Sequence, residues 1–186
     1  MDFDTKLTLA TCHHEAGHAA VAWWFRCAFH DSELFIGPDG QSGGFPFRSF
    51  VNEVSIQLAL AVENAEQRRM AIRDIEREML RLLGGPVAEY RFHGNEANRA
   101  IRFSSEYRDP GSDSSRLRRI LRALTGKDNK EYQLRLQEEC KTIIGEPRTW
   151  QAIQSIANHL MKQRFMQGSD AEAVFTKIGA PRTTTW

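Results

Sequence analysis

The sequence predicts a mainly α-helical protein of several helices with a small β-hairpin or edge-sheet element. Apolar residues recur at helical spacing through most of the chain, and one glycine-rich segment separates two short apolar runs typical of strands. The chain has 186 residues, of which 41% are hydrophobic and 26% are charged, so it can bury a core of ordinary size. Because it has no internal repeat and no long linker, we expect a single domain over residues 1–186.

Charge and cysteine content argue against several classes of protein. The net charge of +1 does not favour a nucleic-acid partner, and the arginines between residues 116 and 122 fit the solvated face of an amphipathic helix. Three cysteines without CxxC spacing form neither a disulfide framework nor a zinc ribbon, and free thiols suit a reducing compartment.

The N-terminus lacks the features of a signal peptide. The longest apolar run, residues 19–25, is too short for a membrane span, which takes about 20 residues. We therefore expect a soluble, cytoplasmic protein.

The first quarter of the chain predicts a buried helix followed by a hairpin. Residues 5–28 are rich in alanine and contain the aromatic cluster 23–25, which we expect in the core. Residues 32–36 have the pattern of a strand, residues 37–44 hold four glycines and a proline typical of turns, and phenylalanines alternate in a second strand at 45–50. This second strand could pair with an extended peptide at a sheet edge or pack as an ordinary hairpin. The sequence favours neither interpretation.

Helices are expected in most of the remaining chain. Residues 52–92 are mostly helical and amphipathic, but the Gly-Gly-Pro at 84–86 is expected to break the helix and start a short new one. After a polar stretch at 93–111, Ser112 and Asp113 are typical of the N-terminal cap of a helix. Further helices are expected at about residues 130–144, 148–166 and 170–178, before a loose tail at 179–186.

The first predicted helix carries an HExxH motif, His14-Glu15-Ala16-Gly17-His18. Residues four apart lie on one face of a helix, so His14 and His18 can reach a single zinc ion. Glu15 lies one step round the helix and can reach a water on that ion without binding the ion itself. Peptide hydrolysis needs this arrangement, because the ion polarises the carbonyl and acidifies the water while the carboxylate takes the proton. The neighbours are small or apolar, and burying these polar groups without partners would be costly.

A catalytic zinc site needs a third protein ligand and one open position. The residues after His18 do not continue the motif with another histidine, so this ligand must come from later in the chain. The residues themselves leave three candidates open, Glu89, His93 and Asp113. Glu89 lies between apolar residues of a short helix and needs a partner if it is partly buried. Asp113 heads a helix, where an N-cap is the simpler interpretation.

Three segments together resemble the peptidase domain of the FtsH-type ATP-dependent metalloproteases. They are HEAGHAAVA at residues 14–22, LLGGPVAEYRFHG at 82–94 and GSDSSRLRRILRAL at 111–124. The closing segment WQAIQSIANHL, at 150–160, is also similar to the last helices of that family, so the resemblance covers nearly the whole chain.

The resemblance implies a role for each of five residues. His14, His18 and Asp113 are expected as zinc ligands, Glu15 as the catalytic base, and Glu89 as the carboxylate that orients a ligand histidine through a hydrogen bond. The family's ATPase module and P-loop are missing from this sequence. We therefore expect action on peptides or unfolded polypeptides, unless a separate ATPase or adaptor supplies folded substrates.

Two classes of function follow from these patterns. The first is a zinc-dependent endopeptidase that hydrolyses unfolded or flexible polypeptides with Glu15 as base. The alternative is a catalytically silent metal-binding regulatory protein, or an interaction module with an empty site. Glu15 favours the enzyme, because zinc binding does not need this residue whereas hydrolysis does. An oligomer is compatible with either class.

Overall fold

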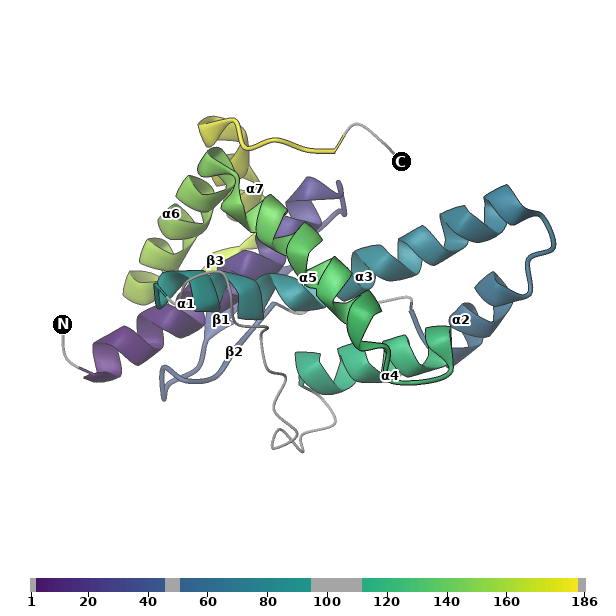
Figure 1. The fold of residues 1–186 in the computed structure, drawn as a ribbon. Helices are drawn as coiled ribbons and strands as arrows, with labels where there is room; N and C mark the ends of the chain where they lie inside the picture. The colour runs from purple at the N-terminus through teal and green to yellow at the C-terminus, as the bar shows by residue number, and fades with distance from the viewer. Residues whose placement is uncertain (1–2, 46–50, 95–111, 184–186) are drawn as a thin grey trace.

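A computed structural model describes residues 3–45, 51–94 and 112–183. The described chain is mainly helical with one small antiparallel sheet, which confirms the expected fold class. Helices α1 (Phe3–Trp24) and α3 (Ala65–Phe92) lie side by side at the centre (Figure 1). The other helices are α2 (Glu53–Leu60), α4 (Asp113–Thr125), α5 (Lys130–Gly145), α6 (Pro147–Gln163) and α7 (Gly168–Ile178).

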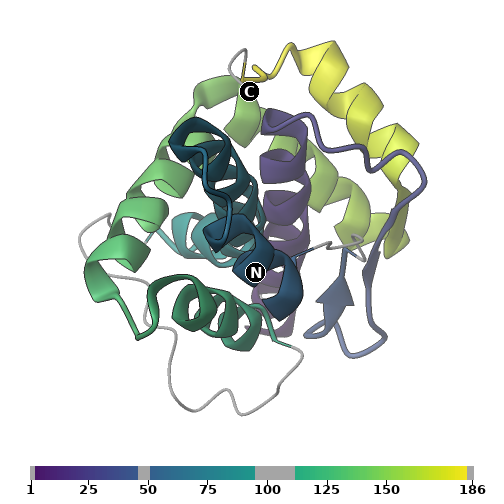
Figure 2. The ribbon, with the colours of Figure 1, turned by 90° about the vertical axis from the view of Figure 1, so that its right-hand side faces the viewer.

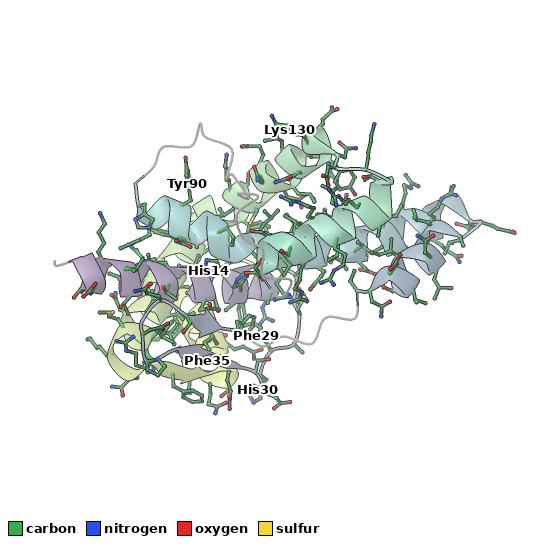
Figure 3. The ribbon with its side chains drawn as sticks, turned by 90° about the horizontal axis from the view of Figure 1, so that it is seen from below. His14, Phe29, His30, Phe35, Tyr90 and Lys130 are labelled. Atoms are coloured by element: carbon green, nitrogen blue, oxygen red, sulfur yellow. The ribbon has the colours of Figure 1, made fainter. Side chains whose placement is uncertain are left out.

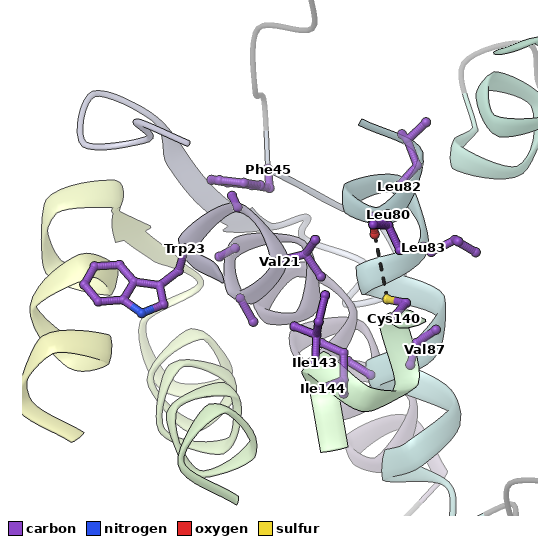
Figure 4. Packing of buried hydrophobic residues seen from close by; sticks show 14 of the residues in the cluster. Val21, Trp23, Phe45, Leu80, Leu82, Leu83, Val87, Cys140, Ile143 and Ile144 are labelled. Atoms are coloured by element: carbon purple, nitrogen blue, oxygen red, sulfur yellow. Dashed lines mark hydrogen bonds between the residues drawn. The ribbon is translucent and has the colours of Figure 1, made fainter. Parts of the chain in front are cut away.

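Helix α1 is the central element of the fold, and Figure 2 shows it surrounded by other helices. Its second half holds four alanines and one glycine, and these small residues allow α3 and α6 to approach closely. A Cβ added at Gly17 would lie 2.3 Å from the carbonyl oxygen of Gly84, so glycine is required at this crossing. Figure 4 shows part of the buried apolar cluster, which includes Val21 of α1, Leu83 of α3 and Ile143 of α5. Of the aromatic cluster at 23–25, Trp23 and Phe25 are buried and Trp24 is partly buried against the core.

The sheet has the order β2-β1-β3 and covers one side of α1. Strand β1 (Glu33–Ile36) agrees with the expected strand at 32–36, but β2 (Gly43–Gly44) consists of two glycines that were assigned to the turn. The expected strand at 45–50 is wrong at Phe45, which is buried outside the sheet, and residues 46–50 lie outside the described part of the chain.

Strand β3 (Phe165–Gln167) is the element that the sequence did not predict. The expected helix at 148–166 ends at Gln163, where Arg164 has a left-handed backbone with φ of 61° and accepts a hydrogen bond from Ile36 N. Met166 then pairs with Leu34, and both side chains are buried. The apolar pattern continues past Gln163 because Met166 is apolar. Its side chain is buried in the sheet, however, and does not extend the apolar face of the helix.

Helix α3 is unbroken from Ala65 to Phe92, so the expected break at Gly-Gly-Pro is wrong. A proline inside a helix typically costs about 3 kcal/mol, because it removes a hydrogen bond and crowds the preceding turn. Side chains buried on both sides of Pro86, such as Leu83, Val87 and Ala88, offset this cost by packing against the core. The two glycines allow the close approach of α1, because a Cβ at either position would clash with α1.

The later helices begin and end near the expected positions. Ser112 caps α4 by accepting a hydrogen bond from Ser115 N, so Asp113 is the first residue of that helix. The described part of the expected loose tail is bonded to the end of α1, through Thr183 N to Trp24 O at 2.8 Å and Trp23 Nε1 to Ala180 O at 3.2 Å. No helix in the described ranges is long and apolar enough to cross a membrane.

Candidate metal centre

Three ligand-type side chains from two helices converge at one point. Asp113 Oδ2 lies 2.9 Å from His18 Nε2 and 3.3 Å from His14 Nε2. The two histidines are one turn apart on α1, and Figure 3 shows His14 where α1 passes beside α3. Asp113 comes from the first turn of α4, 99 residues after His14. In the described part of the chain, these three residues form the one group suited to a metal ion.

The remaining ring nitrogen of each histidine makes a hydrogen bond that orients the ring. His14 Nδ1 donates to Glu89 Oε2 at 2.9 Å, and His18 Nδ1 donates to the carbonyl oxygen of Arg81 at 2.7 Å. Since a carbonyl and an ionised carboxylate only accept, both protons must lie on Nδ1. The Gly85 N–H is 3.3 Å from His18 Nδ1, but the Arg81 carbonyl is closer and determines the tautomer. With these protons on Nδ1, each ring would present its Nε2 lone pair to a bound metal, as a metal requires.

The spacing of Asp113 Oδ2 from each imidazole nitrogen is near that of a tetrahedral zinc site, and all three donor atoms lie within 4.8 Å of one another. With zinc bonds of about 2.0–2.1 Å, two ligand atoms in a tetrahedral site lie roughly 3.3–3.4 Å apart. The His14–Asp113 distance of 3.3 Å has this value, and the His18–Asp113 distance of 2.9 Å is a few tenths of an ångström shorter. Two imidazoles with one carboxylate are a common zinc ligand set that leaves a coordination position open. The residues present therefore fit the ion.

Gly85 provides the space beside these donor atoms. A Cβ at this position would lie 2.4 Å from His18 Nε2 and 2.5 Å from His14 Nε2, far inside normal contact distance. Any side chain at position 85 would therefore occupy the space from which an ion would approach these two nitrogen atoms. The glycine that looked like a helix breaker in the sequence is required by the site.

Asp113 and Glu89 control the protonation of His14. Burial alone would lower the pKa of His14, but hydrogen bonds to Asp113 and Glu89 outweigh it and raise this pKa to about 10. Burial would raise the pKa of Asp113, yet the two histidines hold it well below its usual range. The hydrogen bond from His14 also lowers the pKa of Glu89. At neutral pH the metal-free site is therefore a cation between two carboxylates.

Glu15 is buried next to the cluster, with 6% of its surface exposed. It lies between α1 and the sheet edge, because a Cβ at Gly43 would be 2.8 Å from Glu15 Oε1. Burial raises the pKa of the Glu15 carboxyl, while the charges of His18 and His14 oppose the shift. No described residue donates a hydrogen bond to this carboxylate. It is therefore available to accept a proton within the site.

The other residues weighed from the sequence lie outside the cluster. His13 donates to the carbonyl oxygen of Leu9 at 2.8 Å and stacks on Phe92, so it points away from the group of donor atoms. His93 is exposed at the end of α3 and is not part of the group of donor atoms. Cys12 is a buried free thiol. Residues 95–111 of the polar stretch lie outside the described part of the chain.

Sequence reasoning missed the partner of His18. This partner is a backbone carbonyl, which no residue type can signal, so the Arg81 contact could come only from the three-dimensional arrangement. It also missed Gly43 beside Glu15, although the consecutive glycines at 43 and 44 are a signal of close backbone approach.

Comparison with other proteins does not assign the chain to a family. The sequence matches no model of a known protein family and no curated protein. The function must therefore be argued from the residues of the site.

Proposed function

We propose that this protein is a zinc-dependent endopeptidase that hydrolyses unfolded or flexible polypeptides. The observation that carries the proposal is the convergence of His14 Nε2, His18 Nε2 and Asp113 Oδ2, which lie within 4.8 Å of one another beside the buried carboxylate of Glu15. The resemblance of the three sequence segments to FtsH-type peptidases supports the same assignment. A protein that only stored or sensed zinc would not need a buried acid next to its ligands.

Each residue has a role in this proposal that follows from its position. His14, His18 and Asp113 would hold zinc, which polarises a carbonyl and acidifies water. Glu15 would accept the proton, because burial raises its pKa and so makes its carboxylate a stronger base. Glu89 would keep the proton of His14 on Nδ1. These roles account for all five acid and base groups named here.

The sheet edge beside Glu15 supports an extended polypeptide as the substrate. Among the described residues β2 pairs only with β1, so its other edge is open to a further strand. Gly43 of this edge lies against Glu15, which would bring a paired peptide close to the base. A separate ATPase or adaptor would deliver folded substrates. The three free cysteines support a reducing compartment such as the cytoplasm.

The direct test measures zinc and proteolysis on the same preparation. The purified chain should contain about one zinc per molecule and should cleave casein, an unfolded protein. A chelator should abolish cleavage and added zinc should restore it. A preparation without zinc affinity would overturn the proposal. A zinc-loaded protein that leaves casein and other unfolded proteins intact would favour the regulatory alternative.

A further inference from the structure

The proposed metal site depends on a fixed position of α4. Both histidines belong to α1, whereas Asp113 is the first residue of α4. A displacement of α4 by 1 Å would carry the carboxylate out of zinc-bonding distance, since these bonds vary by only about 0.2 Å. Contacts that fix α4 against the rest of the site therefore determine whether the three ligands stay together.

One buried carboxylate connects both sides of the cluster. Glu78 on α3 is 7% exposed and binds Arg81 through two hydrogen bonds, Oε2 to Nε at 2.9 Å and Oε1 to Nη2 at 2.8 Å. The same Oε1 accepts a hydrogen bond from Arg116 Nη2 at 3.2 Å. Arg81 is the residue whose carbonyl accepts the proton of His18. Arg116 lies three residues after Asp113, on the same face of α4.

We propose that Glu78 is a positioning residue that holds Asp113 over the two histidines. This inference rests on the proposed function, because it needs zinc to bind at His14, His18 and Asp113. Glu78 fixes α4 through Arg116, and it fixes the helical turn that carries the His18 partner through Arg81. One side chain thereby orients ligands from two helices. Its charge is needed because it is shared between two buried or half-buried guanidinium groups.

The same helix contains a matched control. Glu76 is 8% exposed and also binds two arginines, Arg73 and Arg135, together with the hydroxyl of Tyr132. Arg135 and Tyr132 belong to α5, which contributes no residue to the metal site. The two acids thus have similar burial and similar partners, and they differ in whether the partner helix carries a ligand.

The experiment compares two partly exposed arginines, so that both variants fold. The Arg116 side chain is 31% exposed and that of Arg135 is 49% exposed. We expect Arg116→Gln to weaken zinc binding about tenfold, the low end of the range for residues that orient metal ligands. We expect Arg135→Gln to stay within about twofold of the wild type by the same measure. Zinc affinity is measured by competition with a chromophoric chelator, and the cobalt(II)-substituted spectrum reports the geometry of the ligands.

The two buried variants extend the comparison. Glu78→Gln should weaken zinc binding at least as much as Arg116→Gln and change the cobalt spectrum, whereas Glu76→Gln should lower the melting temperature without changing that spectrum. Combining Glu78→Gln with Arg116→Gln should weaken binding by less than the product of the single effects, because both act through one contact.

Wild-type zinc affinity in Arg116→Gln, or equal losses in Arg116→Gln and Arg135→Gln, overturns the positioning role alone. A wild type that binds no zinc overturns the proposed function and this inference with it.

Discussion

The contact between Glu89 and His14 has the shape of a carboxylate–histidine–metal arrangement. Glu89 Oε2 is 2.9 Å from His14 Nδ1, on the side of the ring opposite to Asp113. The carboxylate both fixes the ring orientation and increases the electron density that Nε2 offers to a metal. An amide in its place could still accept the hydrogen bond, but it would carry no charge.

We therefore predict that Glu89→Gln weakens zinc binding on the order of tenfold with little loss of stability, because the geometry is kept while the charge is lost. Isothermal titration of the metal-free protein with zinc measures this change. Glu172→Gln is a matched control, since Glu172 contacts His30 at 3.5 Å away from the cluster. If both variants bind zinc as the wild type does, Glu89 is a packing residue and has no role in the site.

At the scale of elements, the site depends on how closely α1 and α3 approach. Gly17 and Gly84 bring the two backbones together, and Gly85 leaves the space next to both Nε2 atoms. Helix propensity alone would favour alanine over glycine at position 85 by about 0.5–1 kcal/mol. The presence of glycine there is a sign that steric demand outweighs propensity.

We predict that Gly85→Ala lowers zinc affinity by roughly 100-fold or more, the upper end of the effects seen when ligands lose their orientation. The added Cβ must push the imidazoles apart or displace α3. Gly145→Ala is the control, because a Cβ at this helical position meets only Arg91 Nη1 at 3.6 Å, an ordinary contact. Zinc competition and circular dichroism together show whether Gly85→Ala is folded but unable to bind metal. Normal zinc binding by Gly85→Ala would contradict this account of the site.

The elements with strong local signals were the ones that the sequence predicted well. The HExxH spacing on α1, the helical periodicity of α4 and α5 and the cap at Ser112 depend on neighbours in sequence, and the structure has them where expected. The approach of Asp113 to His14 and His18 came from a resemblance, because separations of 95 and 99 residues leave no local pattern.

The errors arose where distant contacts outweigh local preference. Gly84–Pro86 reads as a break, but packing of α1 keeps α3 continuous. Phe165–Gln167 continues a helical pattern, but pairing with β1 makes it a strand. The continuity of α3 and the strand at Phe165–Gln167 both depend on tertiary contacts, which a single sequence does not reveal.

At the scale of the whole molecule, the metal-free site affects how stability depends on pH. The folded pKa of His14, about 10, is above its ordinary value of about 6.5. Protonated His14 therefore stabilises the metal-free fold fully below about pH 6.5, and this contribution is lost as the pH rises through the folded pKa. Zinc must displace the proton, so its apparent affinity should rise over the same interval.

We predict that zinc affinity increases up to about tenfold per pH unit between pH 7.5 and 9, as one displaced proton requires. Free zinc is held constant with a chelator buffer, and the zinc-induced rise in melting temperature is measured at each pH. This rise should be larger at pH 9 than at pH 7.5. A histidine with an ordinary pKa would already be neutral throughout this range, so a constant zinc effect would contradict the proposed coupling of His14 to Asp113 and Glu89.

The central claim is that Glu15 is the base of a zinc peptidase, and the variant Glu15→Gln tests it most directly. The amide keeps the size of the side chain but cannot take up a proton, while His14, His18 and Asp113 are unchanged. We measure zinc content and casein cleavage for wild type and variant. The account predicts equal zinc content and a loss of cleavage of about 10²- to 10⁴-fold, the usual contribution of a general base. Equal cleavage rates at equal zinc content would contradict it.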